Sequence, residues 1–239
     1  ECVESIAMAW REMGLTLDAM RMKTCNKEVR MYIELVGKKH RVNRSVTPPR
    51  IAVATTTKQS PTLETWLHYH AEVLGVEHFF LRVEGASGHV QHLLQQHRWS
   101  RRVTADFDRP GLRSVSQSTS YGQQLHRLTT YVDRMIPLAR DKGLTHIMNI
   151  DDDELVYCPH GRAAFHQEIA RAPPNAFDLH MWNVEAMMPS DSSDNPFHDA
   201  SVFKTNIESF DAYRQGKSLA KLSAAGLRTF GMHHFAADE

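Results

Sequence analysis

From residue 50 onward, short apolar runs alternate with stretches in which apolar residues recur every three or four positions. The apolar runs predict strands at 51–54, 78–83, 101–104 and up to Ile150. The helical spacing predicts helices at 60–75, 90–97 and 118–142. This order, β-α-β-α-β-α-β, predicts an α/β fold with a mostly parallel sheet flanked by helices.

Local signals mark where these helices begin and end. Ser60 is the expected N-cap of the first helix, with Pro61 at its first helical position. Gly75 and Gly143 are the expected ends of the first and last helices, since glycine adopts the backbone conformation that terminates a helix. Pro137 lies inside the last helix and predicts a kink there.

Polar segments follow three of the predicted strands. Thr55–Gln59 is expected to form a loop after the first strand, and Glu84–Ser87 a turn after the second. The carboxylates of Asp151–Glu154 follow Ile150 directly. In parallel sheets, ligands bind beyond the carboxyl ends of the strands, so we expect these three segments to converge at one edge.

The acidic run predicts a metal site. Adjacent carboxylates repel one another, whereas hard cations such as Mg²⁺ and Mn²⁺ prefer oxygen ligands. Asp151 and Asp153 are two positions apart, so on an extended backbone both point to the same side and both could face one ion. A metal–diphosphate site is therefore the leading interpretation, and a solvated acidic turn is the alternative.

Composition excludes some classes of protein. The 239 residues are 41% hydrophobic and 23% charged, with 28 basic and 28 acidic side chains, which disfavours a nucleic-acid binder that depends on a basic face. No apolar run reaches the length of about 18 residues that predicts a membrane span. Three cysteines give no disulfide framework. Neither a dinucleotide fingerprint nor a Walker A motif is present.

Residues 1–48 differ from the rest and are expected to form an N-terminal helical extension with a basic linker, separate from a catalytic domain at 49–239. The basic residues near position 40 favour a solvated connection, and contact with a polyanion or lipid is the alternative. The first residue is glutamate, so the chain is expected to be a fragment of a longer protein.

Several motifs, in order from about residue 50 to 235, resemble glycosyltransferase family 92 and related enzymes of the family-2 type. Their segments W-x-x-Y-H, L-G-V-x-H-F, Y-G-Q, D-x-D-E-F, G-K-S and H-x-F are matched at Trp66–His70, Leu74–Phe79, Tyr121–Gln123, Asp151–Leu155, Gly216–Ser218 and His233–Phe235. The chain departs from the family pattern at Thr65, Leu155 and Glu84, where those enzymes carry Glu, Phe and Asp.

The resemblance implies a GT-A fold, which is Rossmann-like and of the nucleotide-diphospho-sugar transferase type. It implies transfer of a hexose or pentose from a nucleotide sugar, expected to be UDP-linked, to a glycan or other hydroxyl acceptor with Mn²⁺ or Mg²⁺. Family members work in the Golgi lumen of eukaryotes and in the cytoplasm of bacteria, and the sequence does not choose between these compartments.

The resemblance also implies roles for single residues. Asp151, Asp153 and His233 would bind the metal, with His234 the alternative histidine. Nucleotide contacts are expected from residues at the strand ends, at the start of the long helix and in the closing segment: Thr55, Thr56, Lys58, Glu84, Tyr121, Gln123, Asp151, Asp152 and Lys217. Trp66, His70 and Phe79 are explained by their apolar spacing as core residues.

An inverting transfer needs a carboxylate that takes the proton from the acceptor hydroxyl. Glu185 is the first candidate, because it follows a strand predicted at 177–182 and lies near Trp182, whose ring could carry a sugar face. Asp194 is the second. A metal-dependent phosphohydrolase or nuclease that uses the cluster Asp151–Glu154 is an alternative function, and so is a non-catalytic nucleotide- or sugar-binding relative.

Overall fold

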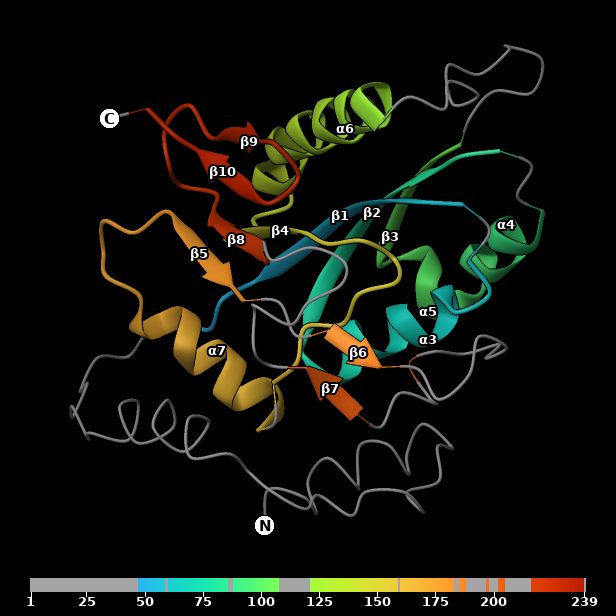
Figure 1. Cartoon of the computed structure of the whole chain (residues 1–239), viewed down its shortest axis with the longest axis horizontal. Helices are drawn as coiled ribbons and strands as arrows, with labels where there is room; N and C mark the ends of the chain where they lie inside the picture. The colour runs from blue at the N-terminus through green and yellow to red at the C-terminus, as the bar shows by residue number, and fades with distance from the viewer. Residues whose placement is uncertain are drawn as a thin grey trace.

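The computed structural model describes residues 47–58, 60–85, 88–107, 121–158, 160–182, 185–187, 197, 202–204 and 216–238. These residues form a layered α/β structure with a central sheet between helices (Figure 1). The sequence prediction of an α/β fold with a mostly parallel, helix-flanked sheet is therefore confirmed. The predicted extension at 1–48 lies almost wholly outside the described residues.

The central sheet has six strands in the order β3-β2-β1-β4-β8-β5. Its strands are β1 (Ile51–Thr57), β2 (Val76–Val83), β3 (Val103–Phe107), β4 (His146–Asn149), β5 (Asp178–Met181) and β8 (Lys217–Lys221). The first four are mutually parallel, whereas β8 runs antiparallel to both β4 and β5. Two small antiparallel pairs accompany it, β6 (Glu185–Met187) with β7 (Val202–Lys204), and β9 (Arg228–Phe230) with β10 (His234–Ala236).

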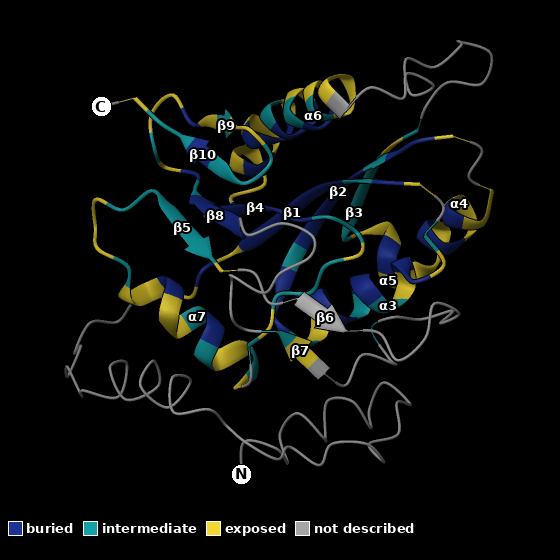
Figure 2. Ribbon diagram, in the orientation of Figure 1, coloured by how far each residue is buried: buried dark blue, intermediate teal, exposed yellow. Residues whose placement is uncertain are grey.

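Alternate residues of β1, β2, β4 and β8 fill two separate cores, one on either side of the sheet. Val53 belongs to the core under α3 (Leu63–His68), η1 (Tyr69–Val73), α4 (Gly88–Gln95), α5 (His97–Ser100) and α7 (Gly161–Arg171). Ala52 and Ala54 belong to the core under α6 (Tyr121–Asp141). Burial on both faces explains why β1 reads as a continuous apolar run (Figure 2). None of the helices in the described part is both long and apolar enough to cross a bilayer.

The structure corrects several predicted boundaries. The expected loop at Thr55–Gln59 is wrong in its first half, because β1 continues to Thr57 and the β-branched threonines fit a strand. The first helix begins after Thr62 rather than Ser60, and its last turns form the π-helix η1. Gly75 and Gly143 have φ values of 77° and 69°, so both end their helices as predicted.

Candidate functional site

The acidic run forms a tight tip directly beyond the carboxyl end of β4. The N–H of Asp151 donates to Oε2 of Glu154 at 3.0 Å, and the N–H of Glu154 donates to the carbonyl oxygen of Asp151 at 3.2 Å. Asp152 turns toward the sheet and accepts a hydrogen bond of 2.5 Å from the hydroxyl of Thr57, at the end of β1. The exposed side of the tip carries Asp153.

Lys217 brings a buried positive charge to this tip. It begins β8, which pairs with β4, and its side chain is only 7% exposed. Its Nζ lies 2.7 Å from Oδ2 of Asp151 and 3.3 Å from Oε2 of Glu154. Burial alone would lower the pKa of Lys217, but the two carboxylates raise it above its ordinary value. The side chain is therefore a fixed ammonium within the acidic cluster.

Two carboxyl groups of the tip have raised pKa values, chiefly because they are desolvated. Burial raises the pKa of Glu154 to about 7, with Lys217 opposing the shift and the charge of Asp151 adding to it. The pKa of Asp153 is raised by burial and then by Asp151. Lys217 pairs with two of the four carboxyl groups of the tip, Asp151 and Glu154, and a further cation would favour the ionised form of the carboxyl groups there.

His233 reaches the same edge from the segment before β10. Its Nδ1 lies 2.8 Å from the carbonyl oxygen of Gly216, so Nδ1 carries the proton when the ring is neutral. Gly216 is required here, because a Cβ would lie 1.7 Å from the carbonyl oxygen of Met181. Burial lowers the pKa of His233, and its ring interacts electrostatically with both Lys217 and Asp151. The closing segment therefore brings an imidazole beside the acidic tip.

Three side chains of one helical segment form hydrogen bonds that hold the backbone at the end of the tip and just after it. Trp66 Nε1 donates to the carbonyl oxygen of Glu154 at 2.8 Å, and the Tyr69 hydroxyl donates to that of Val156 at 2.8 Å. Nδ1 of His70 bonds to the carbonyl oxygen of Trp66 at 2.9 Å, which leaves Nε2 to accept the N–H of Val156 at 3.5 Å. We call Trp66, Tyr69 and His70 the aromatic clamp.

The hydrogen bonds made by the aromatic clamp were not predicted from the sequence. Trp66, His70 and Phe79 are fully buried, so their assignment to the core is confirmed. Two of them nevertheless also carry polar atoms that fix the segment 154–156. The signal was present in the motif W-x-x-Y-H, because an apolar stripe alone does not need indole, phenol and imidazole together. Glu154, which received no separate role from the sequence, fixes the tip by accepting the N–H of Asp151.

The buried imidazole of His70 predicts a loss of stability in acid. Burial lowers the pKa of His70 to about 4, so the folded protein keeps it neutral while the unfolded chain binds a proton below about pH 6.5. Stability is fully present above the unfolded pKa and falls as pH drops toward 4. We expect this residue alone to cost about 2 kcal/mol at pH 5.

Urea unfolding of wild type and His70→Gln at pH 7.5, 6.5 and 5 measures this effect. His78 and His146, whose pKa values also fall to about 4, contribute equally to the pH dependence of stability in both proteins. Glu154 shifts stability with pH in the opposite direction, and it too does so equally in both proteins. The difference between the two proteins therefore isolates His70. Parallel pH profiles for the two proteins would contradict the assignment.

The residues expected to contact the nucleotide differ in how far they are buried. Thr55 is fully buried inside β1, and Thr56 is partly buried, whereas Lys58 is exposed at the strand end. Glu84 is 4% exposed and is surrounded by cations, with Arg127 at 3.1 Å, Arg82 at 3.5 Å and Lys58 at 3.8 Å. This buried carboxylate therefore neutralises a cluster of three cations, of which Arg127 is buried and Lys58 exposed, near the ends of β1 and β2.

For most of the other predicted site residues, the side chain or the whole residue lies outside the described part. Gln123 is exposed near the start of α6, whose first residue is Tyr121, and the side chain of Tyr121 is outside the described part. Glu185 begins β6 rather than following a strand as a loop residue, and its side chain is likewise outside the described part. Asp194 lies outside the described residues. The predicted base is therefore not tested.

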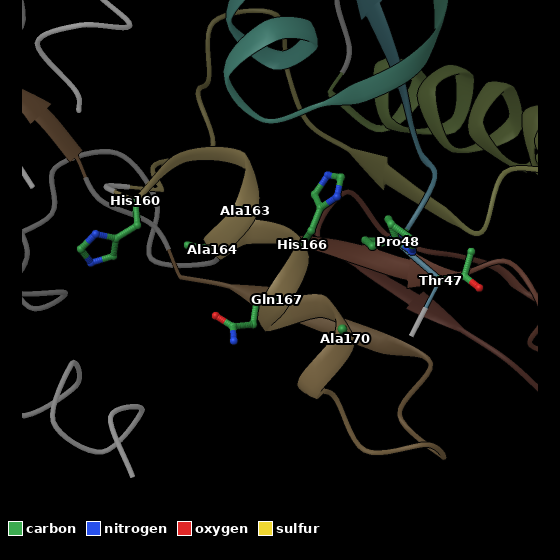
Figure 3. A pocket seen from close by; sticks show the side chains of 9 residues that line it. Thr47, Pro48, His160, Ala163, Ala164, His166, Gln167 and Ala170 are labelled. Atoms are coloured by element: carbon green, nitrogen blue, oxygen red, sulfur yellow. The ribbon is translucent and has the colours of Figure 1, made fainter. Parts of the chain in front are cut away.

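The predicted metal ligands do not come together as a group of three. Among the residues that the structure describes, no group of three or more His, Cys, Asp or Glu side chains could hold a metal ion. A cavity of about 590 Å³ lies elsewhere, between α7 and the residues that precede β1, with His160 and His166 in its wall (Figure 3). That cavity is at the amino end of β1, whereas the acidic tip follows the carboxyl end of β4.

Two curated relatives resemble this chain in sequence. The Arabidopsis thaliana protein named Glycosyltransferase-like At2g41451 is 29% identical over 178 residues, which are 67% of this chain and 39% of that protein. Glycosyltransferase-like At3g57200, also from Arabidopsis thaliana, is 26% identical over 179 residues, which are 67% of this chain and 34% of that protein. No protein-family model matches the chain.

The chain spans between about a third and two fifths of the length of these curated relatives. Their names support a glycosyltransferase relationship for the aligned part, and this agrees with the resemblance drawn from the motifs.

Proposed function

We propose that this protein is a metal-dependent glycosyltransferase of the GT-A type, which moves a hexose or pentose from a nucleotide sugar to a hydroxyl acceptor. The observation that carries the proposal is the acidic tip at the carboxyl end of β4, held from the neighbouring strand by buried Lys217. The sequence relationship to proteins named glycosyltransferase-like supports the class of reaction.

The tip has the chemistry that a divalent cation needs. Asp153 offers an exposed carboxylate, and Asp151 lies beside it with a single ammonium shared between Asp151 and Glu154. Mg²⁺ is usually held by one or two carboxylates together with substrate phosphates and water, so two protein ligands suffice. Asp151 and Asp153 would hold Mn²⁺ or Mg²⁺, with substrate phosphates and water completing the coordination. His233 lies at the same sheet edge, but as placed among the described residues it forms no three-residue ligand set with them.

A cation held there would stabilise the negative charge that grows on the nucleoside diphosphate as the glycosidic bond breaks. Lys217 keeps Asp151 and Glu154 in place at 2.7 and 3.3 Å and adds a positive charge near the phosphates. Lys58, at the end of β1, would contact the nucleoside. The aromatic clamp fixes the backbone from Glu154 to Val156, so the tip presents one arrangement of carboxylates.

The acceptor hydroxyl must lose a proton if the transfer inverts configuration. Glu185 remains our first candidate for this base and Asp194 the second. Both follow β5 in the chain, and β5 is joined to the acidic tip through Lys217, which pairs with Met181.

Incubation of the protein with a panel of UDP- and GDP-sugars, with and without Mn²⁺, tests the proposal. We expect metal-dependent release of the nucleoside diphosphate from at least one donor, and EDTA should stop it. Cleavage of bis(p-nitrophenyl) phosphate without turnover of any nucleotide sugar would instead indicate a phosphohydrolase. Metal-dependent nucleotide binding without turnover of any donor would indicate a non-catalytic relative.

A further inference from the structure

Trp182 stands out among the tryptophans that the structure describes, because 69% of it is exposed, while Trp66 and Trp99 are buried. It directly follows β5, whose last residue Met181 pairs with Lys217. The backbone of Gly216 lies so close that a Cβ on Gly216 would be 3.0 Å from Cα of Trp182. The backbone that carries the exposed indole is thus packed against Gly216, the residue before the lysine that bonds the acidic tip.

A row of rings leads away from Trp182 across three strands. The ring of His180 meets Trp182 edge-on at 5.0 Å between centroids and stacks on His234 at 4.8 Å. His234 on β10 is paired with Phe230 on β9, so their side chains stand on the same face of that pair. Phe230 is 71% exposed. We call Trp182, His180, His234 and Phe230 the aromatic row.

Polar contacts beneath the aromatic row fix its middle. The Ser218 hydroxyl donates to the carbonyl oxygen of His233 at 2.7 Å and lies 3.5 Å from Nδ1 of His180. Asp178 lies 3.7 Å from Nδ1 of His234 and accepts the N–H of Phe235 at 3.5 Å. The two stacked imidazoles are therefore held in place by groups from β5 and β8, which gives the row a defined shape.

The chemistry of the aromatic row fits a carbohydrate chain. A sugar ring has an apolar C–H face, which an exposed indole or phenyl ring covers, and a rim of hydroxyls, which imidazoles bind by hydrogen bonds. One exposed ring would serve a single sugar. Here the contacts pass from Trp182 to His180 at 5.0 Å, from His180 to His234 at 4.8 Å, and from His234 to its cross-strand neighbour Phe230, so more than one ring is offered.

We propose that the aromatic row is the binding surface for an oligosaccharide acceptor, whose reacting end lies at Trp182. The assignment as acceptor rests on the proposed function, whereas the binding of a glycan does not. The row begins beside the acidic tip, so a chain lying along it would present its terminal hydroxyl to the donor. The acceptor is then an oligomer, bound more tightly than the corresponding monosaccharide.

An array of α- and β-linked mono- to hexasaccharides of glucose, galactose, mannose and xylose, probed with the full chain, tests this. We expect binding that strengthens with chain length for at least one series. Trp182→Ala should weaken all such binding about tenfold or more, since one well-stacked ring is worth roughly 1.4 kcal/mol. Phe230→Ala should remove the gain from added units and leave monosaccharide binding unchanged.

Leu138→Ala is the matched control, because Leu138 is an exposed apolar residue on α6, outside the row. Titration with UDP and Mn²⁺ should give the same affinity for all three variants, so loss of the donor site and loss of the row are separable. Absence of binding to every glycan would overturn the proposal. So would a dimeric wild type that Phe230→Ala converts to a monomer, because the row would then be covered by a second copy.

Discussion

Replacement of Lys217 by methionine is expected to lower the free energy of unfolding by about 3 kcal/mol at neutral pH, because removing one partner of a buried ion pair leaves its charge uncompensated. The side chain is 7% exposed and serves two carboxylates, Asp151 at 2.7 Å and Glu154 at 3.3 Å. Methionine keeps the volume of the stem but removes the ammonium, so repulsion within the tip is no longer opposed.

Urea unfolding of Lys217→Met and of Lys221→Met measures this effect. Lys221 is the matched control, because it lies on the same strand and its Nζ contacts the carbonyl oxygen of Pro174 rather than a carboxylate. Millimolar Mn²⁺ should restore part of the stability of Lys217→Met, since the ion supplies the missing positive charge. Equal stability of the two variants would show that Lys217 does not hold the tip together.

Asp153→Ala is expected to abolish metal-dependent binding of UDP or GDP while leaving the fold intact. Asp153 is exposed as a residue, but partial desolvation of its carboxyl group and then the charge of Asp151 raise its pKa, so its removal relieves repulsion. Loss of a group that only orients a metal ligand costs about 10–100-fold in affinity, and loss of the ligand itself should cost at least as much.

Calorimetric titration of UDP and GDP with and without Mn²⁺ measures this loss, and thermal unfolding checks the fold. Asp141→Ala is the control, because it removes an exposed carboxylate at the end of α6, which precedes the amino end of β4, whereas the acidic tip follows the carboxyl end of that strand. An affinity that stays at the wild-type value in Mn²⁺ would remove Asp153 from the site and with it the basis of the proposed function.

Local sequence patterns predicted the main strands and helices well. The apolar run at Ile51–Ala54 and the helical stripe through Trp66 correspond to β1 and to α3 with η1. Both patterns reflect how a strand or a helix buries its own side chains, so they need no knowledge of the partner. Boundaries were less certain, as at Thr55–Thr57, where polar β-branched residues extend a strand instead of opening a loop.

The candidate site was predicted as a set of residues rather than as an arrangement. Asp151 and Lys217 were both singled out, but their 2.7 Å ion pair was not foreseen, because it depends on β8 pairing antiparallel to β4. Glu84 was expected to meet a ligand, and its burial against Arg127 was not foreseen. Contacts between residues far apart in the chain follow from strand order, which periodicity does not encode.

The α/β class, the acidic tip after β4 and the motifs that resemble glycosyltransferases could all be read from the amino-acid sequence. Each of them depends on neighbouring residues in one chain segment. The folded arrangement was needed to see that Lys217 supplies the cation for that tip, that the aromatic clamp holds its backbone, and that the aromatic row joins Trp182 to rings of β5, β9 and β10. Each of these depends on which strands lie side by side, and strand order is fixed by packing of the whole sheet.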